Sequence, residues 1–297
     1  MPGLSDYAAS NALNYLTGSR NMPTLPSVYM GLYTAMPTSD AGTGGTEVSG
    51  TSYARVQVAG AVAATAAFTT ASPNITMTSN PGWVVPGMTA YDLTNSQPIG
   101  TVLTYVGTAL VLTANAAHAS SGSTDSLAFS AFGAASASSG TEPSVTPANS
   151  VTTAPISFPT AGSGGWGTVI GFGLFDALSG GNTLAFDYLG AFNWLPATMS
   201  AASPGVITAH AHGYSAADPV VVTTKYGGVL PTFSQSNLTG VLAVVGPTTD
   251  TFTVTNGGTA VNTSATGDFA VRKIVQQSIA SGVAASFAAG QLTLNLA

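Results

Sequence analysis

Cysteine is absent from this sequence, and charged residues are scarce. The 297 residues include 5 Lys or Arg and 11 Asp or Glu, so 5% of the chain is charged, against about 25% in an ordinary soluble domain. The absence of cysteine excludes disulfide bonds and cysteine-based zinc sites, so packing or assembly must hold the fold. Because the mean hydropathy is +0.34 and few charges keep molecules apart, we expect partners to cover much of the surface.

The few basic residues are scattered, apart from one adjacent pair. They are Arg20, Arg55, Lys225, Arg272 and Lys273. With a net charge of −6, this distribution lacks the basic patch of a nucleic-acid-binding protein. There is no apolar run of about 18 residues that could span a bilayer, and no charged-then-apolar signal peptide opens the chain. We therefore expect no nucleic-acid or membrane partner, and a protein that is made in the cytoplasm and then assembled.

Residues 165–190, with the sequence GWGTVIGFGLFDALSGGNTLAFDYLG, predict the central β-hairpin of the fold. Two apolar runs, 169–175 and 184–189, flank a turn at residues 179–182. The other core segments are expected to assemble around this hairpin.

Both faces of the first hairpin arm carry apolar side chains or glycine. Because strand side chains alternate, Ile170, Phe172 and Leu174 are expected on one side. The other side would carry Val169, Gly171, Gly173 and Phe175. A strand of this kind lies inside a core, and its two glycines predict that another backbone or a bulky ring packs close against it.

Residues 5–17 are the one good helix candidate. Ser5 can cap the first turn, and Gly18 can end the helix. An apolar stripe at helical spacing is formed by Ala9, Ala12, Leu13 and Leu16. The sequence therefore predicts a short, separate N-terminal helix.

Alternating segments elsewhere predict further core strands. In residues 27–34, Val28, Met30 and Leu32 alternate with Tyr29 and Tyr33. Residues 53–58 resume the alternation. The closing strand, residues 291–296, places three leucines on one face, and we expect it to pair with the hairpin or with residues 27–34.

The predicted fold is all-β, an antiparallel β-sandwich core with two inserted small β modules and a short N-terminal helix. The core is discontinuous, and residues 1–21 form an arm that contains the helix. Three segments make up the core, two form modules of short strands, and one is a Ser-, Ala-, Pro- and Thr-rich linker. The core segments are residues 22–72, 150–195 and 274–297, the modules are residues 73–130 and 196–273, and the linker is residues 131–149.

Four core motifs carry a resemblance to a known family. They are a YTAMPT strand end, a GGTEVSG loop followed by SYARV, a W-G-T hairpin and the closing leucine ladder. As a set they resemble small tailed-bacteriophage structural proteins, often labelled tail fibre proteins, and the N-terminal helix segment is similar as well. Short family members lack the two inserted modules. The resemblance implies membership of a virion. If the protein is a structural component, we expect it to contact the major capsid protein or other virion proteins and to form a homo-oligomer, a trimer or a dimer.

His210 and His212 form an H-x-H pattern with Asp218 nearby. If this segment is a strand, both imidazoles lie on one face, which is a spacing that metals use. A third ligand is not evident, so we interpret them as polar side chains beside a loop and predict no metal site or cofactor. His118, alone among Ala and Ser, is expected to be solvated.

Asp176 and Asp187 stand on opposite arms of the hairpin, as a glycosidase pair would. Asp176 also suits the entry to a tight turn, and Asp187 can face water beside Tyr188. No nucleophile elbow or phosphate-binding loop is present. We therefore predict no catalytic residues and no enzyme activity, although a surface depolymerase stays open as a third hypothesis.

Several aromatic residues of the modules could stack on sugars or fill a neighbour's pocket, although core packing is the commoner fate. They are Trp83, Tyr91 and Tyr105 in the first module and Tyr214, Tyr226 and Phe233 in the second. The leading functional hypothesis is a capsid decoration, or head cement, protein whose modules project outward. The alternative is a tail fibre or host-surface adhesin that binds polysaccharide or a receptor.

Overall fold

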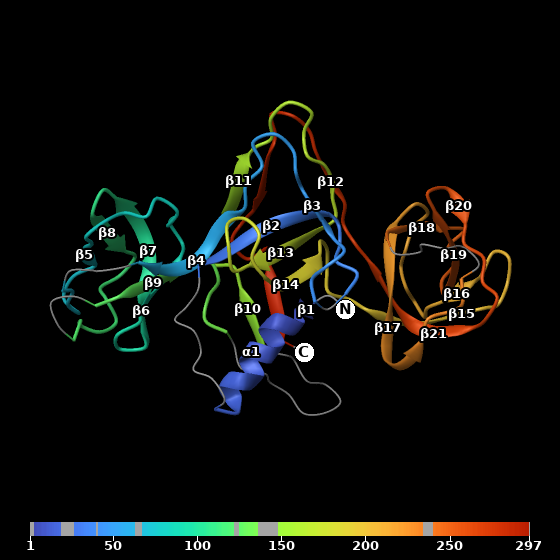
Figure 1. Ribbon diagram of the computed structural model, residues 1–297, viewed down its shortest axis with the longest axis horizontal. Coiled ribbons are helices and arrows are strands. Elements are labelled where there is room, and N and C mark those ends of the chain that lie inside the picture. The colour runs from blue at the N-terminus through green and yellow to red at the C-terminus, as the bar shows by residue number, and fades with distance from the viewer. Residues whose placement is uncertain are drawn as a thin grey trace.

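The computed structural model of the chain consists almost entirely of antiparallel β-structure. It describes residues 3–18, 27–39, 41–62, 67–121, 125–135, 148–233 and 240–296. Strands account for 45% of the chain and helix for 4%, which confirms the predicted all-β class. A central core lies between module one, residues 67–130, and module two, residues 195–273, at opposite ends of the long axis (Figure 1). In these described ranges, no helix is long and apolar enough to cross a membrane.

The central hairpin lies in the middle of the core sheet. Strand β13 (Gly171–Phe175) pairs antiparallel with β14 (Thr183–Tyr188) on one side and with β2 (Val28–Ala35) on the other. Every residue of β13 is buried, which confirms the prediction made from its two apolar faces. The sheet also contains β1 (Gly3–Leu4) beside β14, and β3 (Thr46–Glu47) and β4 (Val56–Val62) beside β2.

A second layer of three two-stranded ribbons covers one face of this sheet. Phe172 of β13 packs against Phe287 of the ribbon layer, with ring centroids 6.4 Å apart. The ribbons are β10 (Ala148–Val151) with β24 (Thr293–Leu296), β11 (Ile156–Thr160) with β23 (Ala284–Phe287), and β12 (Gly167–Val169) with β22 (Gln277–Ile279).

Apolar clusters lie on both faces of the core sheet. The main cluster includes Met30, Leu32 and Phe172 between the sheet and the ribbons, and it continues into module one with side chains such as Ile75 and Leu110. The second, here called the joint cluster, consists of Tyr33, Met36, Ile170, Phe175, Phe186, Val221 and Ile274. The predicted alternation of β2 is confirmed, because Met30 and Leu32 belong to one cluster and Tyr33 to the other.

Gly173 lies where strands and aromatic rings come together. A Cβ atom at this position would be 2.7 Å from the Tyr33 ring and 3.0 Å from the Phe175 ring, too close for carbon atoms. A Cβ atom at Gly171 would overlap Met36. The close approach predicted from these two glycines is confirmed.

The first apolar run is two strands rather than one. β12 pairs with β22, whereas β13 begins two residues later in the core sheet. At the break, the Ile170 N–H donates to the Tyr33 carbonyl. The Ile170 side chain joins the joint cluster, whereas Phe172 lies in the main cluster. The prediction that these two side chains share a face was wrong, because the chain changes sheets at Ile170.

The closing strand β24 pairs with β10, from Ala148↔Leu296 to Val151↔Thr293. Pairing with the hairpin or with β2, as predicted, was wrong, because β13 and β2 already have a neighbour on each edge. The predicted linker, residues 131–149, also begins a strand at its end. Residues 136–147 of that linker lie outside the described part of the chain.

The core sheet continues into module one. Strand β4 pairs with β9 (Leu127–Ser130) from Ala59↔Ser130 to Val62↔Leu127. In Figure 1, β4 runs from the core directly into this module. Its other strands are β5 (Asn74–Thr76), β6 (Thr89–Asp92), β7 (Gln97–Val106) and β8 (Ala109–Leu112). An unbroken hydrogen-bonded sheet therefore fixes module one to the core.

Module two has its own sheet and its own apolar core. The pairing of β16 with β19 closes this sheet into a small barrel around buried side chains such as Ile207, Phe252 and Phe269. Its strands are β15 (Leu195–Met199), β16 (Ile207–Thr208), β17 (Pro219–Val229), β18 (Leu242–Val245), β19 (Thr251–Asn256), β20 (Thr259–Ala260) and β21 (Gly267–Lys273).

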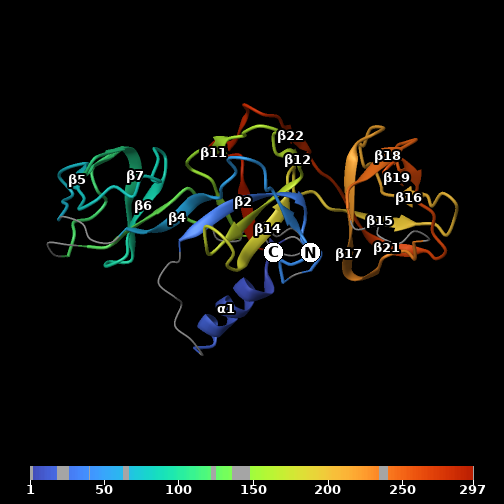
Figure 2. The ribbon, with the colours of Figure 1, turned by 45° about the horizontal axis from the view of Figure 1, so that its top comes forward.

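The predicted N-terminal helix is confirmed as α1 (Asp6–Leu16). The Ser5 hydroxyl accepts a hydrogen bond from the Ala8 N–H at 3.2 Å, which caps the first turn. Gly18 has φ +71° just after the helix, as a terminating glycine does. The helix buries none of its residues, and it leaves the core on a side away from both modules (Figure 2).

Candidate functional site

Arg272 forms the joint between module two and the core. Its side chain, only 1% exposed, extends from β21 to the segment after β14. Nη1 donates to Asp187 Oδ1 at 2.7 Å, and Nε donates to the Ala191 carbonyl at 2.9 Å. Nη2 donates to the carbonyls of Tyr188 and Gly190, at 3.2 and 3.1 Å. The guanidinium thus ties one module strand to one core hairpin.

Asp187 was expected to face water, and this was wrong, because Arg272 binds its carboxylate. Burial raises the pKa of Asp187, and the adjacent guanidinium only partly offsets that effect. Asp176, on the other arm, accepts hydrogen bonds from the Asn182 backbone at 2.6 Å and side chain at 2.7 Å. The two carboxylates are therefore engaged separately, one in an ion pair and one in the predicted turn.

A second cationic clamp holds the hairpin turn. Arg55 binds Glu47 through two hydrogen bonds, of 2.9 and 2.7 Å. Its Nη1 also donates to the Ala177 and Gly180 carbonyls, each at 2.8 Å, and its guanidinium stacks 3.4 Å from the centroid of the Phe175 ring. The family-like motifs GGTEVSG and SYARV therefore meet at this clamp.

Tyr53 connects the same clamp to the core. Its hydroxyl donates to Glu47 at 2.9 Å and accepts from the Leu32 N–H at 2.8 Å. The pKa of Tyr53 is raised well above its ordinary value, mainly by burial and further by the Glu47 carboxylate. The Tyr53 ring packs edge-on against Trp166, whose indole N–H donates to the Thr51 carbonyl. The W-G-T motif thus also serves the packing of this region.

His210 and His212 do not share a strand face. They flank a turn in which Ala211 has φ +49°, so the expected alternation is broken. His210 is exposed and contacts Asp250 at 3.0 Å, whereas His212 is buried against Phe252. The prediction that both imidazoles lie on one face was wrong.

Asp218, the other suggested metal ligand, pairs instead with Lys273 at 2.8 Å. Among the residues that the structure describes, no group of three or more His, Cys, Asp or Glu side chains is arranged to hold a metal ion.

His118 is half-buried, so its predicted solvation was wrong. It packs against Phe68, and its Nε2 lies 3.8 Å from the Asp92 carboxylate. Asp92 and Asp125 are fully buried, and the Asn95 amide donates to both, at 2.8 and 3.0 Å. Burial alone would raise the pKa of Asp92, but hydrogen bonds led by those from Asn95 hold it below the ordinary value.

The sequence analysis did not predict this cluster. The sequence could have indicated it, because His118, Asp92 and Asp125 are the only Asp, Glu, His, Lys or Arg residues between 67 and 130. Three such residues in an otherwise uncharged module have a strong electrostatic reason to lie together when buried.

The suggested aromatic contact residues mostly pack inside the modules. Trp83 and Tyr105 both contact Phe129, while Tyr214 packs against Phe252. Phe233 packs against the module-two core, and Tyr91 is half-buried. The side chain of Tyr226 lies outside the described residues.

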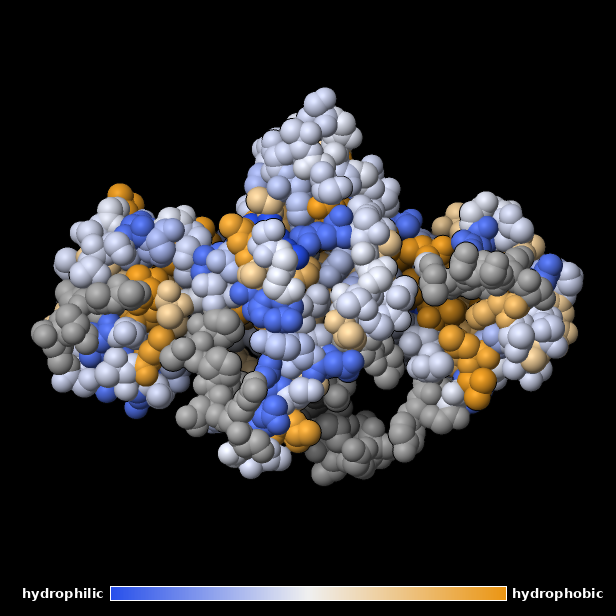
Figure 3. Space-filling view, viewed as in Figure 1, coloured by the Kyte–Doolittle hydropathy of each residue, from blue (hydrophilic) through white to orange (hydrophobic). Residues whose placement is uncertain are grey.

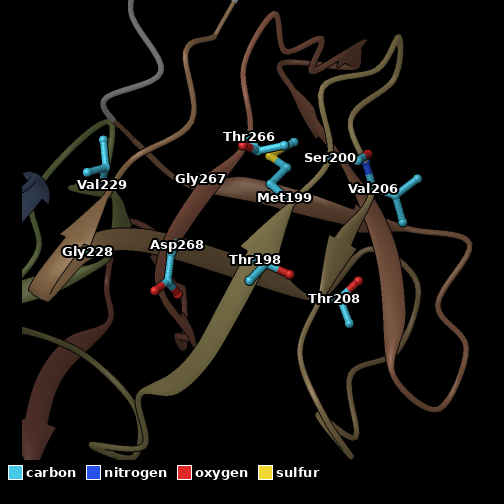
Figure 4. A pocket seen from close by; sticks show the side chains of 10 residues that line it. All are labelled: Thr198, Met199, Ser200, Val206, Thr208, Gly228, Val229, Thr266, Gly267 and Asp268. Carbon is cyan, nitrogen blue, oxygen red and sulfur yellow. The ribbon is translucent and has the colours of Figure 1, made fainter.

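Module two has an open groove of about 750 Å³ on its surface (Figure 4). Thr198 of β15 and Thr208 of β16 lie side by side in its wall, and Asp268 of β21 is nearby. The lining residues are Thr198, Met199, Ser200, Val206, Thr208, Gly228, Val229, Thr266, Gly267 and Asp268. None of them is aromatic, so the groove offers hydroxyl and carboxylate hydrogen bonding without a stacking platform.

A second cleft, of about 620 Å³, lies beside the joint. Phe192 and Val275, which follow β14 and β21, are both exposed and line it together with Asp187. Gln277 and Gln291 add amide groups. On the face of the molecule that Figure 3 shows, most of the coloured surface is near neutral in hydropathy, and apolar side chains lie on both modules.

These features define an all-β protein in which paired ionic side chains hold strands and modules together. Residues 3–106 match a family model described as Podophage GP4 fiber I protein gp80. The match includes α1, β2 to β4 and the first strands of module one, and it confirms the predicted tail-fibre-type phage family. It supports a structural protein of a phage virion. No curated protein and no solved structure matches the chain.

Proposed function

We infer that this protein is a fibre-type component of a phage virion, in which a rigid core carries two β modules outward. The observation that carries this proposal is the family match over residues 3–106, which spans the N-terminal helix and the core-sheet strands β1 to β4. The virion is accordingly the proposed location.

The geometry supports an adhesive role. Module one is continuous with the core sheet, and module two is tied by Arg272 and the joint cluster. Both modules are thereby held in defined directions, which lets several weak contacts act together. We propose that binding needs no catalysis, since Asp187 and Asp176 are each engaged in structural contacts.

The position on the particle separates this proposal from the capsid decoration hypothesis. Decoration is favoured by a specific observation: the described chain forms three compact bodies rather than a shaft with a long repeat. Immunogold labelling of intact particles, followed by cryo-electron microscopy, tests the difference. Labelling confined to a tail appendage supports the fibre role, and labelling over the head supports decoration.

Host adsorption tests the adhesive part. Purified protein in excess is expected to slow adsorption of the parent phage if the modules contact a host polysaccharide or receptor. Thr198→Trp with Thr208→Trp would fill the module-two groove, and Leu103→Glu on module one is a surface control. Undiminished adsorption at saturating protein would contradict the receptor-binding role.

A further inference from the structure

We propose that the cleft beside Arg272, here called the joint cleft, binds a neutral saccharide. This site rests on the proposed adhesive role and specifies the chemical class of its ligand. The cleft measures about 620 Å³, within the roughly 300–1,000 Å³ of small-molecule sites. A protein partner, by contrast, commonly covers a wide surface of roughly 800 Å² on each side.

The joint cleft lies where the chain enters and leaves module two. Phe192 belongs to the connection from β14 to β15, and Val275 belongs to the connection from β21 to β22. These two connections, which both lead from the core into module two (Figure 1), lie side by side, since the Val275 N–H donates to the Leu189 carbonyl at 2.8 Å. Gln291, just before β24, lines the cleft from the ribbon layer. The insertion of module two therefore completes this cleft.

One carboxylate oxygen of the joint cleft is available to a ligand. Asp187 lines the cleft and keeps 24% of its side chain exposed. Its Oδ1 accepts hydrogen bonds from Arg272 Nη1 and from the Tyr188 N–H, each at 2.7 Å. Its Oδ2 accepts none from the residues that the structure describes. Because the ion pair already fixes the carboxylate, Oδ2 can accept a ligand hydroxyl at little further cost in conformational entropy.

Two glutamine amides supply hydrogen-bond donors to the same cleft. The Gln291 Oε1 accepts a hydrogen bond from the Ala288 N–H at 2.7 Å, which fixes the amide and leaves its Nε2 hydrogens for a ligand. Gln277 is exposed beside it in the lining and offers both a donor and an acceptor. Hydroxyl groups can donate as well as accept, so they can satisfy these amides and the carboxylate together.

Phe192 adds an exposed aromatic ring. It is 50% exposed, and the Arg272 guanidinium carbon lies 5.3 Å from its ring centroid, a cation–π contact that orients the ring. Phe172 and Phe287, whose ring centroids are 6.4 Å apart, also line the cleft. The C–H groups of a pyranose ring can pack on such an aromatic surface while its hydroxyl groups bind the amides and the carboxylate.

The chemistry of the lining selects a neutral ligand. The described residues that line the cleft include no Lys, Arg or His, so an anion would meet the Asp187 carboxylate without a cation to bind. The charge of Asp187 is already paired with Arg272, so a cation would gain little from it. A purely apolar ligand would leave the amides and the carboxylate oxygen without partners. A neutral saccharide satisfies each of these groups.

Saturation-transfer NMR on the purified full chain tests the site directly. The probes are the methyl pyranosides of glucose, galactose, mannose and rhamnose at millimolar concentration, with methyl glucuronide as the anionic comparison. At least one neutral pyranoside should receive saturation, and the glucuronide should bind at least about tenfold more weakly than the best neutral probe, because Asp187 repels it. Transfer to none of the neutral probes, or equal binding of the glucuronide, would overturn the proposal.

Variants of exposed residues assign the binding to the joint cleft. Phe192→Leu keeps an apolar side chain but removes the ring, and Gln277→Ala removes an amide; each should weaken binding at least about fivefold. Phe192→Tyr keeps the ring and should bind like the wild type. Gln276→Ala is the matched control, because Gln276 is exposed next to Gln277 but does not line the cleft. Unchanged binding by both Phe192→Leu and Gln277→Ala would place the saccharide elsewhere and overturn the proposal.

Host adsorption separates this site from the proposed function. Saccharide binding by the purified chain, with no effect of that chain on phage adsorption, would support the joint cleft and contradict the adhesive role. Inhibited adsorption without saccharide binding would support the adhesive role and overturn the joint cleft as its saccharide site.

Discussion

Asp187 on β14 and Arg272 on β21 are 85 residues apart in the chain, and their charged groups lie 2.7 Å apart at the joint of core and module two. The guanidinium also binds three backbone carbonyls of the same core segment. Arg272 is almost fully buried, so it donates to these groups where little water is available, although the Asn193 N–H also donates to the Ala191 carbonyl.

Arg272→Met should destabilise the protein by about 3–5 kcal/mol, because it leaves the Asp187 carboxylate without its ion pair and removes the donor to the Tyr188 and Gly190 carbonyls. Urea unfolding followed by circular dichroism measures this. The adjacent Lys273→Met is the matched control. It removes an ion pair whose lysine is 47% exposed, so its cost should stay below about 1 kcal/mol. Equal costs for the two variants would refute the role given to the buried joint.

Arg55→Lys should cost about 1–3 kcal/mol although it keeps the charge. Lysine cannot reproduce the paired bonds to Glu47 together with the bonds to the hairpin-turn carbonyls. Thermal unfolding monitored by tryptophan fluorescence is suitable, because Trp166 packs against Tyr53 beside the clamp. A melting temperature unchanged from wild type would show that a point charge is sufficient there.

Gly173→Ala should destabilise the core by about 1–3 kcal/mol, since its Cβ would overlap the Tyr33 and Phe175 rings. Gly240→Ala is the control, because a Cβ there meets no atom within 4 Å. Denaturant midpoints of the two variants should differ clearly. If Gly173→Ala matched the control, the close packing against β13 would be contradicted.

Asp92→Asn should cost about 1–3 kcal/mol at pH 7, because a carboxylate accepting the Thr94 and Asn95 N–H groups is lost. The folded-state pKa of Asp92 is lowered from its ordinary value of 3.8. Its charge therefore stabilises the fold above about pH 4, and this contribution disappears as the pH falls through the folded-state pKa. Urea unfolding between pH 2.5 and 7 should show that the difference in free energy of unfolding between variant and wild type becomes smaller as the pH falls. A difference in free energy of unfolding that does not change with pH would contradict the lowered pKa of Asp92.

Local patterns were sufficient for the elements themselves. The period-2 alternation of β2, the glycine-containing apolar run of β13 and the Ser5-to-Gly18 signals of α1 each predicted the observed structure. These signals lie within a few residues, and they act through backbone geometry and the water-facing side of each segment. They also carried the family resemblance.

Contacts between distant segments could not be derived in the same way. The expected partners of β24 were wrong, because strand pairing depends on which sheet edges are already occupied. The expected exposure of Asp187 to water was also wrong, because an ion pair depends on which distant segment the fold brings next to it. Sequence by itself determined an all-β, charge-poor chain with a central hairpin and a capped helix, since these follow from periodicity and composition. Only the tertiary structure decided that β24 pairs with β10, that module two closes into a barrel and that Arg272 binds Asp187. Each of these contacts joins segments that are far apart in the chain, so it depends on how the whole chain packs.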